Sequence, residues 1–167
     1  MFEQSEGLNT QGIKYLRSGD YKNAINYFIE AVKIDGNLNA AYNLGYCAFH
    51  GYGVPKDYKK ALDMLYIFTD LSGTVANNAR YLMGVIFCNG GYGISQDKET
   101  AKMYFTKAAQ NGHAWATLEC ARMLQLEGEY PHARQLLQKA MELGKDDPAL
   151  QKEAKRLIKW NRIMRFC

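Results

Sequence analysis

The chain of 167 residues is the size of one domain, and a composition of 47% hydrophobic and 13% aromatic residues can bury an ordinary core, which argues against disorder. No run approaches the roughly 20 apolar residues of a membrane span, and residues 1–6 lack the charged-then-apolar order of a signal peptide. The net charge of +4 lies entirely in residues 145–167, and the remainder of the chain is balanced. We therefore expect a single cytoplasmic domain over residues 1–167 with a basic C-terminal segment.

The first predicted unit, residues 5–37, is a pair of helices joined by a turn at residues 19–21. Large, small and aromatic residues recur at helical spacing in the first helix, and Ala, Phe and Ala recur in the second. These positions are Leu8, Gly12, Tyr15, Ala24, Phe28 and Ala31. Small residues allow two helix axes to approach closely. The six residues resemble the pattern of the tetratricopeptide repeat.

The next two predicted units, residues 38–76 and 77–113, are copies of each other. Matching positions recur after 39 or 40 residues, with Gly45 returning as Gly84, residues 51–54 as 91–94, Asp57 as Asp97 and Ala61 as Ala101. The G-x-G-V-x-x-D turn followed by K-A resembles the Sel-like repeat, a longer relative of the tetratricopeptide repeat. Residues 107–113 match that family's K-A-A-x-x-G-H close, whereas residues 68–73 depart from it.

The fourth predicted unit, residues 114–147, returns to the short form, and a last helix follows over residues 148–166. In the fourth unit the repeat positions are Ala121, the turn at 128–130, Ala133, Leu137 and Ala140. Asp147 is a suitable N-cap and Pro148 a suitable first helical residue. The last helix is amphipathic, with Leu150, Ala154, Leu157 and Met164 on one face and Lys152, Lys155, Arg156, Lys159 and Arg162 on the other. It is expected to cap the stack.

Together these resemblances imply an all-α, right-handed α-solenoid of about nine helices. In such stacks the first helices line a concave groove that holds a partner. The corresponding residues are Asn9, Ile13 and Arg17 in the first unit, Tyr42, Asn43, Tyr46 and His50 in the second, Asn78, Tyr81, Val85 and Asn89 in the third, and Trp115, Leu118, Arg122 and Gln125 in the fourth. A mixture of Tyr, Trp, Asn and Arg is typical of a peptide-binding surface.

A second interpretation of the same residues is structural, because Tyr42, Tyr81 and Trp115 could pack between neighbouring repeats. Asn43 is the sharpest binding candidate, since an amide can both donate to and accept from a peptide backbone. Some family members bind acidic chaperone tails through a five-residue carboxylate clamp. Only Asn43 matches that clamp, and the other four places hold Asn9, Ile13, Asn78 and Leu82. Chaperone-tail binding is therefore not expected.

No catalytic, metal or cofactor site is expected. The cysteines form no C-x-x-C pair, and Cys47, Cys88 and Cys120 fall on the first helices of successive repeats, where a small apolar residue is wanted. Cys47 and His50 could touch on one helix, but nothing indicates a third catalytic group. His113 and His132 lie on other repeats, and the Gly-Tyr-Gly turns join helices, not a strand to a helix, so they do not predict a phosphate site.

The predicted function is a non-enzymatic protein-interaction module that holds a peptide or protein segment in its groove. One alternative is a dedicated binder of a single client, such as a secretion chaperone or a toxin-immunity protein. Another is binding of an anionic surface through the basic last helix, where Trp160, Ile163 and Phe166 lie among the charges as possible contacts. Six basic residues on one helix are fewer than nucleic acid usually requires, so nucleic acid and membrane are the less favoured partners.

Overall fold

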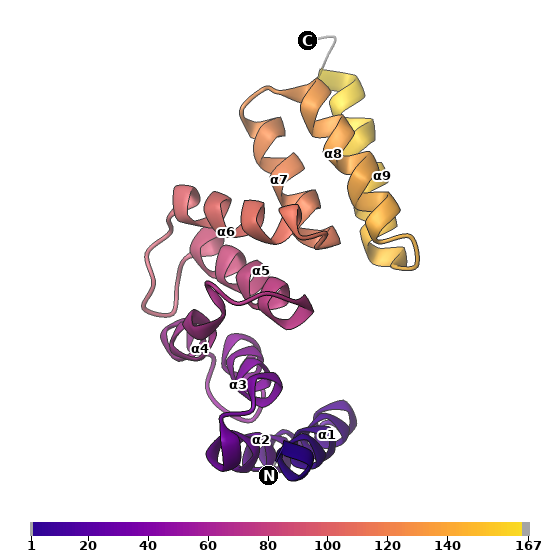
Figure 1. The fold of residues 1–167 in the computed structure, drawn as a ribbon. Coiled ribbons are helices and arrows are strands. Elements are labelled where there is room, and N and C mark those ends of the chain that lie inside the picture. The colour runs from indigo at the N-terminus through magenta and orange to yellow at the C-terminus, as the bar shows by residue number, and fades with distance from the viewer. Residues whose placement is uncertain (1, 165–167) are drawn as a thin grey trace.

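The computed structural model describes residues 2–164, with side chains described as far as Asn161, and shows a curved stack of helix pairs (Figure 1). The elements are α1 (Phe2–Ser18), α2 (Tyr21–Asp35), α3 (Leu38–His50), α4 (Tyr58–Leu65), the 3-10 helix η1 (Tyr66–Phe68), α5 (Thr74–Asn89), α6 (Lys98–Gln110), α7 (Ala114–Leu126), α8 (Tyr130–Leu143) and α9 (Pro148–Met164). Consecutive helices pair into four hairpins, and α9 packs against α7 and α8. The predicted all-α solenoid is confirmed.

Each hairpin crosses where a small residue of its first helix meets a large residue of its second. A Cβ atom added at Gly12 would lie 2.5 Å from Cε1 of Phe28, and one added at Gly84 would lie 2.5 Å from Cε1 of Phe105. Both distances are far below van der Waals contact, so the phenylalanine ring occupies the space that a side chain would need. The recurring glycine is thus a packing requirement of the fold.

Most of the helices begin at a side chain that accepts a hydrogen bond from a free backbone N–H group. These N-caps are Asp20 for α2, Asn37 for α3, Asp57 for α4, Asp97 for α6, His113 for α7 and Asp147 for α9. The predicted role of Asp147 is confirmed, because its Oδ1 accepts from the backbone N–H groups of Ala149 and Leu150, both at 3.0 Å. Pro148 is the first residue of α9, as expected.

The second hairpin ends irregularly. Its second helix, α4, stops at Leu65 after eight residues, η1 adds three more, and residues 69–73 form no helix. α5 then begins at Thr74, three residues before the boundary that the sequence placed at residue 77. The departure of residues 68–73 from the repeat close therefore corresponds to a real difference in structure.

A buried arginine of α5 holds the irregular segment. Arg80 is only 6% exposed. Its guanidinium donates from Nε and Nη2 to the carbonyl oxygen of Thr69, at 3.3 and 3.1 Å, and from Nη2 to the carbonyl oxygen of Leu71. Nη1 donates to Oδ1 of Asn77 at 2.8 Å. The guanidinium group thereby satisfies backbone carbonyl groups that would accept hydrogen bonds within the helix if the helix continued.

The two long glycine turns tie neighbouring repeats together. Lys56 of the first turn places its Nζ 4.9 Å from the ring centroid of Tyr92 in the second turn, and 5.0 and 5.5 Å from those of Tyr58 and Phe49. Tyr92 has a φ of 50°, a conformation uncommon for a residue with a side chain. An ammonium group enclosed by three rings is stabilised by cation-π attraction, so the turns have a structural role.

The last helix covers the end of the fourth hairpin. Leu150, Ala154 and Leu157 are buried against α7 and α8, and the residues exposed on α9 include Lys152, Lys155, Arg156 and Lys159. This confirms the predicted amphipathic pattern over the described side chains. The structure does not describe the side chains of Arg162, Ile163 and Met164. Phe166 and the end of the expected helix also lie outside the described residues. Within residues 2–164, the structure contains no helix with the length and hydrophobicity needed to cross a membrane.

Candidate functional site

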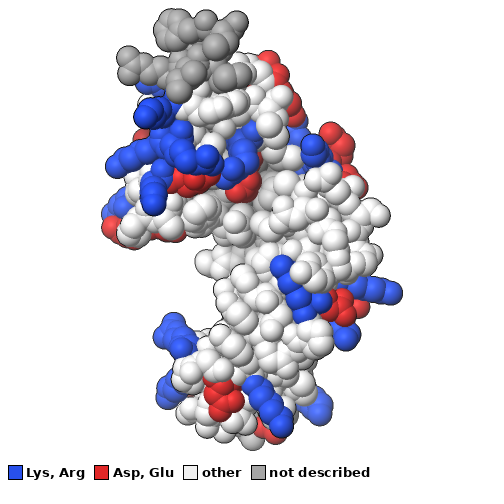
Figure 2. Space-filling model, turned by 180° about the vertical axis from the view of Figure 1, so that it is seen from behind, with Lys and Arg blue, Asp and Glu red and all other residues white. Residues whose placement is uncertain are grey.

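α3 and α5, in the middle of the stack, carry no exposed Asp, Glu, Lys or Arg side chain. α3 contains no Asp, Glu, Lys or Arg, and the one such residue of α5 is the buried Arg80. Figure 2 shows the consequence: the hollowed side of the stack is uncharged, and charged side chains gather on either side of the hollow. Because 23% of the residues in the chain are charged, an uncharged surface of this kind differs in composition from the rest of the molecule.

An aromatic stripe follows α3. Tyr42, Tyr46 and His50 recur every four residues, a spacing that places them on one face of the helix. The rings of Tyr46 and His50 lie 4.2 Å apart, and His50 stacks on Tyr52 of the following turn at 5.1 Å. Tyr52 in turn stacks on Tyr21 of the first hairpin at 4.6 Å. The stripe is therefore fixed in place by its own contacts.

Two of the predicted tyrosines are largely packing residues. Tyr42 meets Phe68 edge-on, with ring centroids 6.4 Å apart, and Tyr81 stacks on His113 of the next hairpin at 4.8 Å. Burial raises the pKa of both phenols to about 12. Phe68 belongs to the same hairpin as Tyr42, whereas His113 is the N-cap of α7, so the Tyr81 contact joins neighbouring hairpins and the Tyr42–Phe68 contact does not.

Asn9 and Asn43 come together although 34 residues separate them. Nδ2 of Asn43 donates to Oδ1 of Asn9 at 2.9 Å, and Nδ2 of Asn9 donates to Oε1 of Glu6 at 3.2 Å. Asn9 is 2% exposed, so it does not lie on an open surface as expected, and we correct its placement. Asn43 remains half-buried, and its amide is oriented by Asn9.

The candidates of the fourth hairpin contact α9, and a recess of about 250 Å³ between α7 and α9 is lined in part by Arg122 and Gln125. Nε1 of Trp115 donates to Oδ2 of Asp147 at 2.8 Å, and the Nε2 atom of the buried Gln125 donates to the carbonyl oxygen of Leu157 at 3.1 Å. Leu118 is fully buried. The expectation of accessible side chains is corrected for Leu118 and Gln125, because both are buried, whereas Trp115 is half-buried.

Arg122 belongs to a ladder of alternating charges between α7 and α9. Its Nε lies 3.1 Å from Glu119 and its Nη2 lies 3.0 Å from Glu153, which also pairs with Arg156. Burial raises the pKa of Glu119 despite the neighbouring guanidinium, whereas hydrogen bonding from Arg156 lowers the pKa of Glu153. The ladder fastens the last helix and leaves Arg122 with little freedom to bind a partner.

The remaining candidates stay accessible to different degrees. Arg17, His50 and Asn89 are exposed, and Ile13, Tyr46, Asn78 and Val85 are half-buried. We call the accessible candidates of α3 and α5 the middle face; its members are Asn43, Tyr46, His50, Asn78, Val85 and Asn89.

The three described cysteines show no sign of activation. Burial raises the pKa of Cys47 to about 11, and burial also raises the pKa values of the Cys88 and Cys120 thiols. A thiol with a raised pKa stays protonated at neutral pH and is a weak nucleophile. Burial lowers the pKa of His50, which stacks on aromatic rings. Among the described residues, no three His, Cys, Asp or Glu side chains are arranged to hold a metal ion.

Comparison with known proteins places these hairpins in a family. The model of the Sel1 repeat matches residues 38–70, 77–113 and 125–145, which is more than half of the chain. The chain belongs to the Sel1 repeat family. The first hairpin, α1 and α2, lies outside the matched segments.

Solved Sel1 proteins have a similar fold. A Sel1 repeat protein from Oxalobacter formigenes is 26% identical with a TM-score of 0.65, over 82% of this chain and 54% of the other. The c5321 protein, a protective antigen present in uropathogenic Escherichia coli strains, is 26% identical with a TM-score of 0.70, over 84% of this chain and 31% of the other. Sel1 repeat proteins generally mediate protein-protein interactions.

Curated relatives match over a short stretch. The DAP3-binding cell death enhancer 1 proteins of Mus musculus and Rattus norvegicus are each 40% identical over 55 residues. The match covers 33% of this chain and 11% of each relative. One third of this Sel1 chain therefore matches a small part of those proteins.

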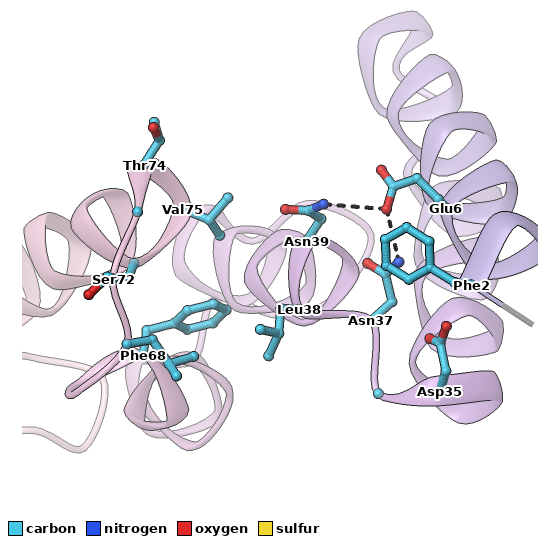
Figure 3. Close-up of a pocket in the computed structure, with 14 residues that line it drawn as sticks. Phe2, Glu6, Asp35, Asn37, Leu38, Asn39, Phe68, Ser72, Thr74 and Val75 are labelled. Carbon is cyan, nitrogen blue, oxygen red and sulfur yellow. Dashed lines mark hydrogen bonds between the residues drawn. The ribbon is translucent and has the colours of Figure 1, made fainter.

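A pocket that sequence reasoning missed lies at one edge of the stack (Figure 3). It has a volume of about 400 Å³ and lies between the start of α1, the junction of α2 and α3, and the start of α5. We call it the edge pocket; its lining residues are Phe2, Glu6, residues 35–39, Phe68 and residues 71–76. The one sequence signal for it was the irregular close at residues 68–73, which supplies part of the lining.

Proposed function

We propose that this Sel1 chain is a non-enzymatic protein-interaction module whose middle face binds a peptide or a protein segment. The observation that carries the proposal is the absence of exposed charge from α3 and α5, combined with their accessible aromatic and amide side chains. The cores of protein interfaces are depleted of charged residues and enriched in aromatic ones. The middle face has this composition.

The geometry of Tyr46 supports the same proposal. Its ring lies 4.2 Å from the ring of His50 and 6.3 Å from the ring of Tyr42. A half-buried ring that is already fixed loses little conformational freedom on binding, so more of its contact energy contributes to affinity.

Asn43 is suited to hold the backbone of an extended segment. One N–H of its amide donates to Asn9, and that bond sets the orientation of the group. The carbonyl oxygen and the second N–H of such an amide can pair with the N–H and C=O of a single residue. Because such an amide would contact the backbone of the partner, segments of different sequence could bind. The rings of Tyr46 and His50 would supply the specificity.

Affinity capture with the whole chain as bait, followed by mass spectrometry, would identify the partner. The dissociation constant of that partner is then measured for the wild type and for Tyr46→Ala and Asn43→Ala. Removal of a central aromatic contact should weaken binding about tenfold to thirtyfold. One captured partner at fixed stoichiometry would support a dedicated single-client binder, and several partners would support an adaptor.

Tyr66→Ala is the matched control. Tyr66 is an exposed tyrosine of the same hairpin but lies on η1, outside the middle face. Its replacement should leave the dissociation constant unchanged. The proposal fails if Tyr46→Ala and Asn43→Ala bind as tightly as the wild type while their melting temperatures match it.

A further inference from the structure

We propose that the edge pocket is a second docking site, separate from the middle face, for a partner segment that places an apolar side chain beside a lysine or an arginine. The proposal does not depend on the function of the middle face. It rests on the volume of the pocket, on the exposed apolar residues around it, and on the sign of its charge.

The pocket has the size and lining of a site for a side chain. Its volume of about 400 Å³ falls within the range of ligand pockets. Phe68, which is 1% exposed, contributes to its floor. Figure 3 shows Phe2 and Leu38, from different helices, beside the same space as Phe68. Side chains from separate elements therefore enclose one recess.

Exposed apolar residues concentrate here. Phe2 is 74% exposed, Leu38 46% and Leu71 38%, and all three line the pocket. Single exposed apolar residues are ordinary on a protein surface, but several around one recess indicate a contact site. Covering them with an apolar side chain of a partner would remove their surface from water.

The charge of the pocket has one sign. Glu6 and Asp35 line it, and none of the lining residues within the described part of the chain is a lysine or an arginine. Hydrogen bonds from Asn37, Asn9 and Asn39 lower the pKa of Glu6, with Asn37 donating at 3.0 Å. Asp35 accepts a hydrogen bond from the hydroxyl of Ser5 at 2.7 Å. Both carboxylates are thus held in place before a partner arrives.

This arrangement selects the occupant by charge. A lysine or arginine next to the apolar side chain would face two fixed carboxylates, whereas an acidic residue in that place would be repelled. A second copy of the chain is a rival occupant, because α9 is basic and its Trp160 is 39% exposed. The experiment below separates the two.

The test titrates the whole chain, labelled with ¹⁵N, with N-acetyl-Leu-Arg-amide and N-acetyl-Leu-Glu-amide, and follows the amide resonances by NMR. The Leu-Arg probe should bind about fivefold more tightly, since two partly exposed charge pairs contribute about 1 kcal/mol in total. Its shift changes should concentrate at residues 36–39 and 71–76. Equal affinities, or shift changes elsewhere, would overturn the proposal.

Variants identify the groups responsible. The double substitution Glu6→Gln with Asp35→Asn should abolish the preference for the Leu-Arg probe, whereas Glu30→Gln with Asp63→Asn, two exposed carboxylates outside the pocket, should preserve it. Leu38→Ser, at a position that is 46% exposed, should weaken the binding of both probes. Tyr46→Ala should change neither titration, so failure here is distinguishable from failure of the middle face.

Sedimentation of the wild type and of the Glu6→Gln, Asp35→Asn variant checks the rival occupant. A concentration-independent monomer in both is the expected result. Self-association of the wild type that the variant abolishes would assign the pocket to a second copy and overturn the proposal.

Discussion

The second and third hairpins share one turn motif but close in different ways. Both contain the Gly-Tyr-Gly turn and an aspartate N-cap, yet α4 ends after eight residues and α6 continues for 13. The third hairpin passes through Gly112 directly to the His113 cap of α7. The second passes through irregular residues that Arg80 holds. In both hairpins the turn therefore sets where the second helix begins. The way that helix ends depends on residues of the following hairpin, such as Arg80 of α5.

This difference has a structural consequence. The irregular close contributes Leu71, Ser72 and Gly73 to the edge pocket, and α5 begins there without a side-chain N-cap. The departure from the repeat pattern thus supplies part of the lining of this pocket.

Replacement of Arg80 should produce the largest effect. Arg80→Met keeps the apolar stem but leaves the carbonyl groups of Thr69 and Leu71 without their donors, and should lower the free energy of unfolding by about 2–4 kcal/mol. Urea denaturation measures this. Arg134→Met, at an exposed position of α8, is the control and should change it by less than about 0.5 kcal/mol. Equal effects of the two substitutions would refute a structural role for Arg80.

The helix crossings give a smaller contrast between the same two hairpins. Gly84→Leu should lower the free energy of unfolding by about 1–3 kcal/mol, because a Cβ there would lie 2.5 Å from the ring of Phe105. Gly45→Ala should be milder, since its Cβ would lie 3.0 Å from Cδ2 and Cγ of Leu65, a less severe overlap than the 2.5 Å at Gly84. For a matched comparison, thermal melts of Gly84→Ala and Gly45→Ala are measured in parallel, and the larger loss of stability is expected for Gly84→Ala. A larger loss at Gly45 would contradict the packing account.

The close of the third hairpin should give the smallest effect, and one that depends on pH. Nδ1 of His113 accepts a hydrogen bond from the backbone N–H of Ala116 at 3.0 Å, and burial lowers the pKa of the imidazole below 6.5. The imidazole of His113 therefore binds a proton more readily in the unfolded chain than in the folded one. The stabilisation by this N-cap is complete above pH 6.5, and it is lost as the pH falls from 6.5 through the lower pKa of the folded state.

His113→Asn keeps a capping oxygen that does not titrate in this range. The wild type should therefore lose about 0.5–2 kcal/mol more stability than the variant on acidification, the value of one N-cap. Thermal melts between pH 7.5 and 5 measure the difference. Parallel pH profiles for the two proteins would show that the cap does not titrate.

Much of the fold could be predicted from local patterns. The hairpins, the amphipathic last helix and the Asp147 cap depend on residues close together in the sequence, and the structure confirms them. The site was less predictable. Asn9 and Gln125 were expected in a groove, but contacts with residues more than 30 positions away bury them.

Repeat spacing, small residues and turn glycines determined this protein's stack of helix hairpins, because each hairpin needs only its own residues and those of its neighbours. Tertiary structure decided which residues remain accessible. The last helix covers the fourth hairpin, the long turns join their neighbours through Lys56, and Arg80 holds the chain that borders the edge pocket. The accessibility of a side chain depends on which distant parts of the sequence pack against it. Helical periodicity is a local pattern and does not predict those contacts.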